Sequence, residues 1–83
     1  MTKKMTKLLS KYESNLNCIV SLYRKGIYDF DKSIDSIIET QEDFSNMIHA
    51  AWRYGLISEK EFDHCWDEET RIYNIAVGKV EDY

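Results

Sequence analysis

Three segments of the chain repeat apolar side chains at steps of three and four residues, the spacing that lines one face of a helix. The first segment ends in two cations followed by Gly26, which suits a helix C-terminus. Thr2 or Thr6 is placed to cap its start. The pattern predicts a helix over residues 4–25. Its apolar positions are Met5, Leu8, Leu9, Tyr12, Leu16, Ile19, Val20 and Tyr23.

The second periodic segment predicts a helix over residues 32–54, ended by Gly55. The apolar residues of the connection before it, residues 26–31, are expected to fold back over the end of the bundle. Short side-chain oxygens that suit the N-cap are those of Asp29, Asp31 and Ser33. The predicted buried face comprises Ile34, Ile37, Ile38, Gln41, Phe44, Ile48, Ala51 and Trp52.

The boundary between the second and third segments carries a complete helix-start signal. Ser58 and Glu61 have the spacing of a capping box, in which each side chain accepts from the backbone N–H of the other residue. Ile57 and Phe62 form the matching hydrophobic staple. Because so few residues follow Gly55 before this cap, the second and third helices must form a tight antiparallel hairpin.

The third segment predicts a helix over residues 58–80, with fraying beyond Ala76 because Gly78 weakens the last turns. Its predicted buried face comprises Phe62, Cys65, Trp66, Glu69, Tyr73, Ala76, Val77 and Val80. Three helices of similar length with short links predict an all-α, compact three-helix bundle that forms a single domain, residues 1–83.

Two polar residues, Gln41 and Glu69, interrupt the buried faces of the predicted hairpin. They stand at similar distances from the turn, and buried polar groups require hydrogen-bond partners. We therefore expect them to bond to each other or to Tyr12. The alternative is that they mark where the two faces open to solvent or to a second subunit.

Composition supports a folded helical chain. Apolar residues make up 43% of the 83 residues and charged residues 31%, which argues against disorder, and the absence of proline argues against a turn-rich β-fold. No apolar stretch reaches the ~18–20 residues of a membrane span. The N-terminus has the charge of a signal peptide but no apolar run behind it, so we expect a cytoplasmic protein with Cys18 and Cys65 as thiols.

Catalysis and metal binding find little support in the sequence. His64 and Cys65 are adjacent and diverge around a helix, so they do not form a nucleophile and its base. A zinc site needs three or four convergent ligands, but His64 with Glu68 and Cys65 with Glu69 are only two pairs on different sides of one helix. We expect no enzyme activity, no catalytic or metal site and no cofactor.

Charge is unevenly distributed along the chain. Residues 1–25 carry six basic side chains against one acid, residues 26–57 two against six, and residues 58–83 three against eight. The acids of the third helix would be repelled by phosphate, which disfavours it as a DNA recognition helix. A small DNA-associated regulator that uses the basic N-terminal helix, with Lys3, Lys4, Lys7 and Lys11, remains the alternative.

These observations favour a non-catalytic protein-binding module. An acidic surface on the second and third helices, flanked by apolar residues off their buried faces, is expected to dock on a basic host protein that handles nucleic acid. The predicted contact residues are Glu59, Asp63, Asp67, Glu68, Ile72 and Ile75. An ordinary solvated acidic face, a homodimer built on the same apolar residues, and a structural or assembly role are the other interpretations.

Two resemblances accompany this interpretation. The residues from Gly55 to Phe62, GLISEKEF, resemble the turn of short helical hairpins found at the C-termini of many bacterial proteins. That resemblance implies a hairpin and no activity. In composition, the short Lys-, Ile-, Asn- and Tyr-rich chain resembles accessory proteins of phages and mobile elements, a population that includes small anti-CRISPR inhibitors. This second resemblance implies a small inhibitor that binds a host protein.

Overall fold

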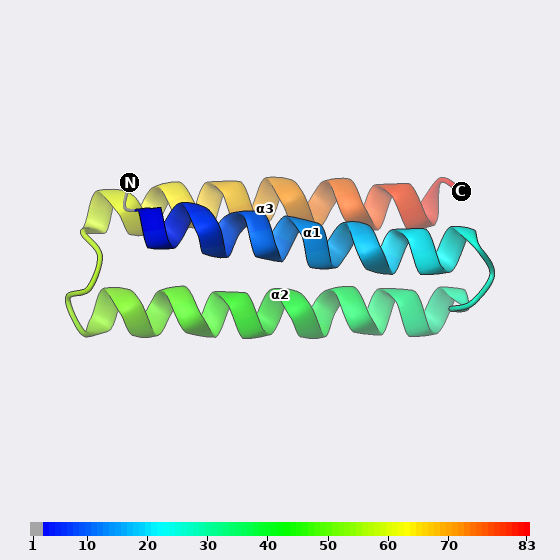
Figure 1. Ribbon diagram of the computed structural model, residues 1–83, viewed down its shortest axis with the longest axis horizontal. Helices are drawn as coiled ribbons and strands as arrows, with labels where there is room; N and C mark the ends of the chain where they lie inside the picture. Colours follow the sequence, from blue (N-terminus) through cyan, green and yellow to red (C-terminus); the bar gives the residue numbers. More distant parts are fainter. Residues whose placement is uncertain (1–2) are drawn as a thin grey trace.

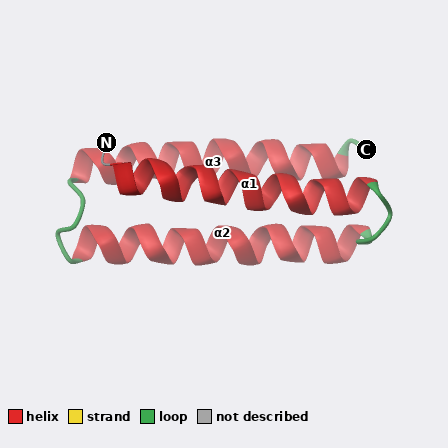
Figure 2. Cartoon of the chain, viewed as in Figure 1, coloured by secondary structure: helices red, strands yellow, loops and turns green. Residues whose placement is uncertain are grey.

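Two glycines in the left-handed region divide the chain into three helices. Gly26 has a φ of +78° and Gly55 a φ of +73°, a conformation that side chains with a Cβ rarely adopt. The computed structural model describes residues 3–83 and contains α1 (Lys3–Arg24), α2 (Phe30–Arg53) and α3 (Glu59–Glu81) (Figure 1). The predicted all-α three-helix bundle is confirmed, with irregular chain confined to the bundle ends (Figure 2).

Side-chain caps begin the second and third helices. Asp29 is the N-cap of α2 and accepts from the backbone N–H of Lys32 at 2.7 Å. At α3 the predicted capping box is present, with the Ser58 hydroxyl accepting from the backbone N–H of Glu61 at 3.1 Å. At α1, Thr6 lies inside the helix and is not its cap, and Thr2 lies outside the described residues.

The helices run up, down and up, so α1 and α3 are parallel and both lie antiparallel to α2 (Figure 1). Each helix packs against both others along a body of 42 × 17 × 16 Å. The start of α1 lies at the same end as the α2–α3 turn, and the C-terminus lies at the other end.

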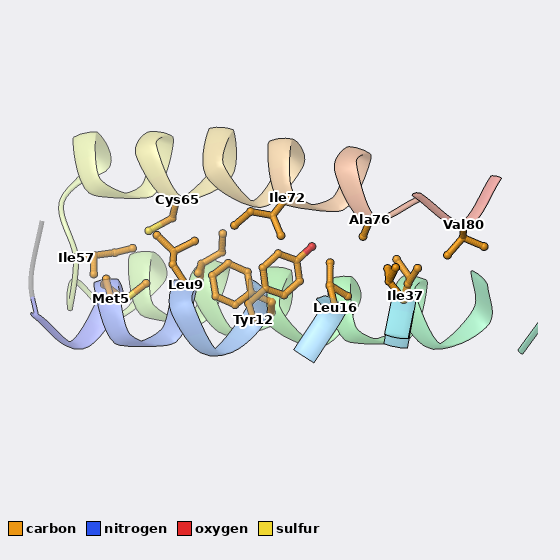
Figure 3. Close-up of a cluster of buried hydrophobic side chains, with 13 residues drawn as sticks. Met5, Leu9, Tyr12, Leu16, Ile37, Ile57, Cys65, Ile72, Ala76 and Val80 are labelled. Atoms are coloured by element: carbon orange, nitrogen blue, oxygen red, sulfur yellow. The ribbon is translucent and has the colours of Figure 1, made fainter. Parts of the chain in front are cut away.

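The core is a single apolar column between the three helices (Figure 3). It contains most of the predicted positions, including Leu16, Ile37 and Ile48, which are fully buried. Tyr12 stacks on Phe44 with ring centroids 4.6 Å apart. Ser33 is buried as well, because its hydroxyl donates to the Asp29 carbonyl oxygen at 2.7 Å within the first turn of α2.

The polar interruption of the hairpin has the predicted partners. The Gln41 amide donates to the carboxylate of buried Glu69, and the Tyr12 hydroxyl donates to the backbone carbonyl of Glu69 at 3.5 Å. The Thr70 hydroxyl also donates to the Glu69 carboxylate, at 3.3 Å. These bonds join all three helices at mid-bundle.

The predicted helix bounds agree with the observed ones to within two residues, but two predictions about the ends differ. α3 continues as a helix past Gly78 to Glu81, and Val80 is buried against the core. Ile27 does not fold back over the bundle end, since it is 66% exposed. Phe30 does pack there, edge-on to Tyr23, with ring centroids 6.4 Å apart.

Candidate protein-interaction surface

Four rings gather between α2 and α3 near the turn that joins them, and we call them the aromatic cluster: His49, Trp52, Phe62 and Trp66. Trp52 stacks on Phe62 with ring centroids 4.8 Å apart. His49 meets Phe62 at 5.1 Å and Trp66 at 5.5 Å, both edge-on. The rings therefore form one continuous contact across the two helices.

The aromatic cluster is partly open to solvent. Trp52 is 45% exposed and Trp66 is 44% exposed, so the prediction that both belong to the core is wrong. Each ring rests on the edge of the bundle, because the narrow column between the helices is already filled by Ile48, Ile57 and Cys65. Half of each indole surface is left facing water.

Local sequence explains how the rings meet. The capping box starts α3 directly after the turn, so α2 and α3 run side by side from their first shared residues. His49 and Trp52 are three residues apart on α2, and Phe62 and Trp66 are four residues apart on α3. These spacings put each pair on one helix face, at matching distances from the turn.

Exposed carboxylates lie beside the aromatic cluster on α3, and we call them the acidic row: Glu59, Asp63 and Asp67. All three are exposed and lie four residues apart, so they follow one line along the helix. Asp63 and Asp67 each follow a cluster ring by one residue, about 100° around the helix. Three of the predicted contact residues thus lie beside an exposed apolar surface. That surface consists of the two indoles and not of the predicted isoleucines.

Glu68, the fourth predicted acid, lies on the opposite side of α3. Its carboxylate accepts from the Arg71 guanidinium at 2.7 and 3.0 Å, and Arg71 reaches Glu13 of α1 at 3.9 Å. The hydrogen bond that Arg71 donates to Glu68, together with the negative charge of Glu68, raises the pKa of Arg71. Glu68 therefore belongs to the α1–α3 side and does not join the acidic row.

The two predicted isoleucines are also separated. Ile72 is only 6% exposed, so its assignment to an exposed contact surface is wrong. It packs in the hydrophobic core. Ile75 is 45% exposed, but it lies near the C-terminal end with Arg24, Lys79 and Tyr83. The predicted six-residue surface is therefore not contiguous.

A second apolar surface lies on the other side of α2. A groove of about 500 Å³ runs between the start of α1 and the end of α2. Met47, Tyr54 and Leu56 are exposed along it, and Lys4 lies at its edge. The sequence analysis placed Met47 and Tyr54 off the buried face, and that placement is confirmed.

The basic residues of the N-terminal helix form a separate surface. Lys3, Lys4, Lys7 and Lys11 are all exposed on α1. The acidic row lies on α3 beside the aromatic cluster, whereas these lysines belong to α1. The two surfaces of opposite charge therefore lie on different helices and can be altered independently.

Residues 3–83 form no cluster of metal-ligating side chains. No three His, Cys, Asp or Glu side chains of this range come together in a way that would hold a metal ion. Burial raises the pKa of the Cys65 thiol, with a smaller contribution from the charge of Glu61, which disfavours the reactive thiolate. His64 and Cys18 are exposed on different helices.

Comparisons of the chain with protein-family models, with curated proteins and with solved structures find no match in any of the three. None of the helices formed by residues 3–83 has an apolar stretch long enough to traverse a bilayer. The function must therefore be argued from the surfaces of the bundle.

Periodicity alone did not reveal the aromatic cluster. It counted Trp52, Phe62 and Trp66 as core because they repeat with the buried residues. The available signal was the width of the faces, since a slim bundle cannot bury two indoles at one level in addition to its aliphatic column. Equal spacing from the turn would then have paired the rings.

Proposed function

We propose that the chain is a non-catalytic protein-binding module that docks the α2–α3 surface on a basic, nucleic-acid-handling protein in the cytoplasm. In this proposal it acts as a small stoichiometric inhibitor, of the kind carried by phages and mobile elements. The observation that supports it best is the juxtaposition of two half-exposed tryptophans with the exposed carboxylates of the acidic row.

The two parts of this surface have complementary effects on binding. Tryptophan is among the residues that contribute most to interface affinity, because burying a large ring removes much apolar surface from water. Carboxylates at the edge of an interface accelerate encounter with a basic partner and suppress encounter with nucleic acid. Together they favour a basic protein surface that also offers apolar contacts.

A second candidate function is a DNA-associated regulator that uses α1. The observation that favours it is the exposure of Lys3, Lys4, Lys7 and Lys11 on one helix. Such a protein would bind duplex DNA through phosphate contacts, with an affinity that falls steeply as salt rises.

Paired charge reversals separate the two functions. We expect Asp63→Lys with Asp67→Lys to abolish capture of a basic protein from bacterial lysate, and Lys3→Glu with Lys7→Glu to leave the capture intact. Quantitative mass spectrometry of proteins retained at low and high salt measures this, and circular dichroism checks that each variant is helical. Should the lysine variant alone lose activity, together with binding to duplex DNA, the regulator replaces the inhibitor.

A further inference from the structure

The exposed surface along which α2 and α3 lie side by side is long enough to hold a helix. Trp52 lies at one end, and Ile38, which is also exposed, lies on the same side of α2 toward the other end. The bond between Gln41 and Glu69 fixes the register in between, so Ile38 comes level with Tyr73 of α3. The 14-residue separation of Ile38 and Trp52 corresponds to about 21 Å along α2.

Charges on both bordering helices are mainly negative. The acidic row follows the α3 edge near the turn, and exposed Asp35, Glu39 and Glu42 follow α2 over its first half. Because the helices are antiparallel, these carboxylates of α3 lie near the turn and those of α2 lie toward the opposite end of the hairpin. An occupant lying along both helices would therefore have exposed carboxylates near each of its ends.

From this arrangement we propose that the exposed α2–α3 surface binds a single basic amphipathic helix of the partner protein, an inference that rests on the proposed function. The apolar side of that helix covers the aromatic cluster and Ile38, and its Lys and Arg side chains reach the carboxylates along α2 and α3. The occupant thus packs as a fourth helix beside the hairpin, which is a common mode of peptide recognition.

An extended peptide fits this surface less well. The surface is formed by side chains of two helices whose backbone groups are already paired within each helix, so no sheet edge is offered between α2 and α3. A peptide in extended form would leave its own N–H and C=O groups without partners against the rings. A helix satisfies these groups internally and presents only side chains.

A second copy of this chain does not supply such a helix. Its only basic helix is α1, whose apolar side already packs in the core through Leu9, Tyr12, Leu16 and Val20. The outward side of α1 carries lysines with Ser14 and Cys18 and offers no apolar stripe. The occupant is therefore a helix from another protein.

The tryptophans provide a direct readout, because Trp52 and Trp66 are the only two in the chain and both belong to the aromatic cluster. The probe is a synthetic helix of about 14 residues made of Leu and Lys, with Leu on one face. We expect this peptide to shift the tryptophan emission to shorter wavelength in a saturable way. A peptide of the same composition with its order scrambled, so that no apolar face forms, should bind at least about tenfold more weakly.

Matched variants test the location of the site. Ile38→Lys, and Asp63→Lys with Asp67→Lys, should each weaken peptide binding by about tenfold or more. The controls are Ile75→Lys, an isoleucine that is also exposed but lies on the other side of α3, and Glu81→Lys with Asp82→Lys, the same charge change at the far end of that helix. Both controls should bind the Leu–Lys peptide as the unaltered chain does.

Three results would overturn the inference: no emission shift with the Leu–Lys peptide, equal binding of the scrambled peptide, or equal weakening by the control variants. If lysate capture still depends on Asp63 and Asp67 while the peptide does not bind, the proposed function stands and the helical occupant is wrong. If capture is also independent of these residues, both proposals fall. Circular dichroism of every variant separates loss of binding from loss of fold.

Discussion

The two sides of α3 differ in the side chains that cover the core. Toward α1, Glu68, Arg71 and Glu13 lie across the groove above Leu9 and Ile72, so charged side chains cover the apolar core. Toward α2, the rings of Phe62 and Trp66 form the surface themselves, and a partly buried hydrogen bond joins Gln41 to Glu69. One helix thus has a charged side, which faces α1, and an aromatic side, which faces α2.

This difference shows that the bundle does not require an exposed aromatic surface. On the side toward α1, long charged side chains lie over buried Leu9 and Ile72. The same solution was available between α2 and α3, where the sequence has tryptophan instead. An apolar surface that folding does not demand is more readily explained by binding.

The variant with the largest expected effect tests whether the aromatic side of α3 contributes to folding as much as the core does. Ile48→Ala should cost about 2–5 kcal/mol of unfolding free energy, because Ile48 is fully buried. Trp66→Ala should cost less than half as much, since almost half of the indole already faces water. Urea denaturation of both variants measures this. Equal losses of unfolding free energy would mean that Trp66 supports folding as a core residue does, and would remove the contrast between the two sides of α3.

The hydrogen-bonded pair Gln41 and Glu69 should contribute to stability as a unit. Gln41→Leu should cost about 1–3 kcal/mol, because the Glu69 carboxylate stays buried with one partner fewer. Adding Glu69→Leu should restore much of that loss, since two apolar side chains of similar size can pack where the polar pair stood. A double-mutant cycle of denaturant melts measures the coupling, and simple additivity would mean that the two side chains do not support each other.

This pair also shows what sequence reasoning could reach. Gln41 and Glu69 were predicted as partners because hairpin geometry relates positions by their distance from a turn, and the turn was fixed by Gly55 and the capping box. The boundaries of the helices followed from the same local signals. Such features depend on a few neighbouring residues and on simple geometry.

Periodicity was less able to divide α3 into its two sides. It treated Ile72 as lying off the core and Trp66 as lying within it, and both assignments are wrong. A face defined on one helix has no fixed edges until two partner helices are placed against it. The small Ala76 and the large Trp66 repeat alike in sequence, but only the small side chain fits the narrow column.

Stability at alkaline pH should report on Tyr12, which lies in the core beside Glu69. Burial, and then the negative charge of Glu69, raises the pKa of Tyr12 above its ordinary value of 10.0. Above about pH 10 the unfolded chain therefore loses this proton while the folded chain keeps it, so stability should fall as pH rises from there. Tyr12→Phe should have a flatter stability profile in this range, measured by thermal melts. Identical slopes would mean that the other tyrosines, not Tyr12, cause the alkaline loss.

The smallest expected effect concerns the ion pairs on the charged side of α3. Arg71→Met keeps the aliphatic stem over Ile72 and removes the contacts to Glu68 and Glu13, which are exposed enough for water to replace them. Its melting temperature should change less than in any variant above, and the change should vanish in about 1 M salt, where the screening length is only ~3 Å. Binding of the Leu–Lys peptide should be unaltered, because Arg71 lies on the other side of α3 from the aromatic cluster. A large loss of stability would show that the ion pairs hold α1 on α3, and the charged side chains would then be part of the bundle's support as well as its cover.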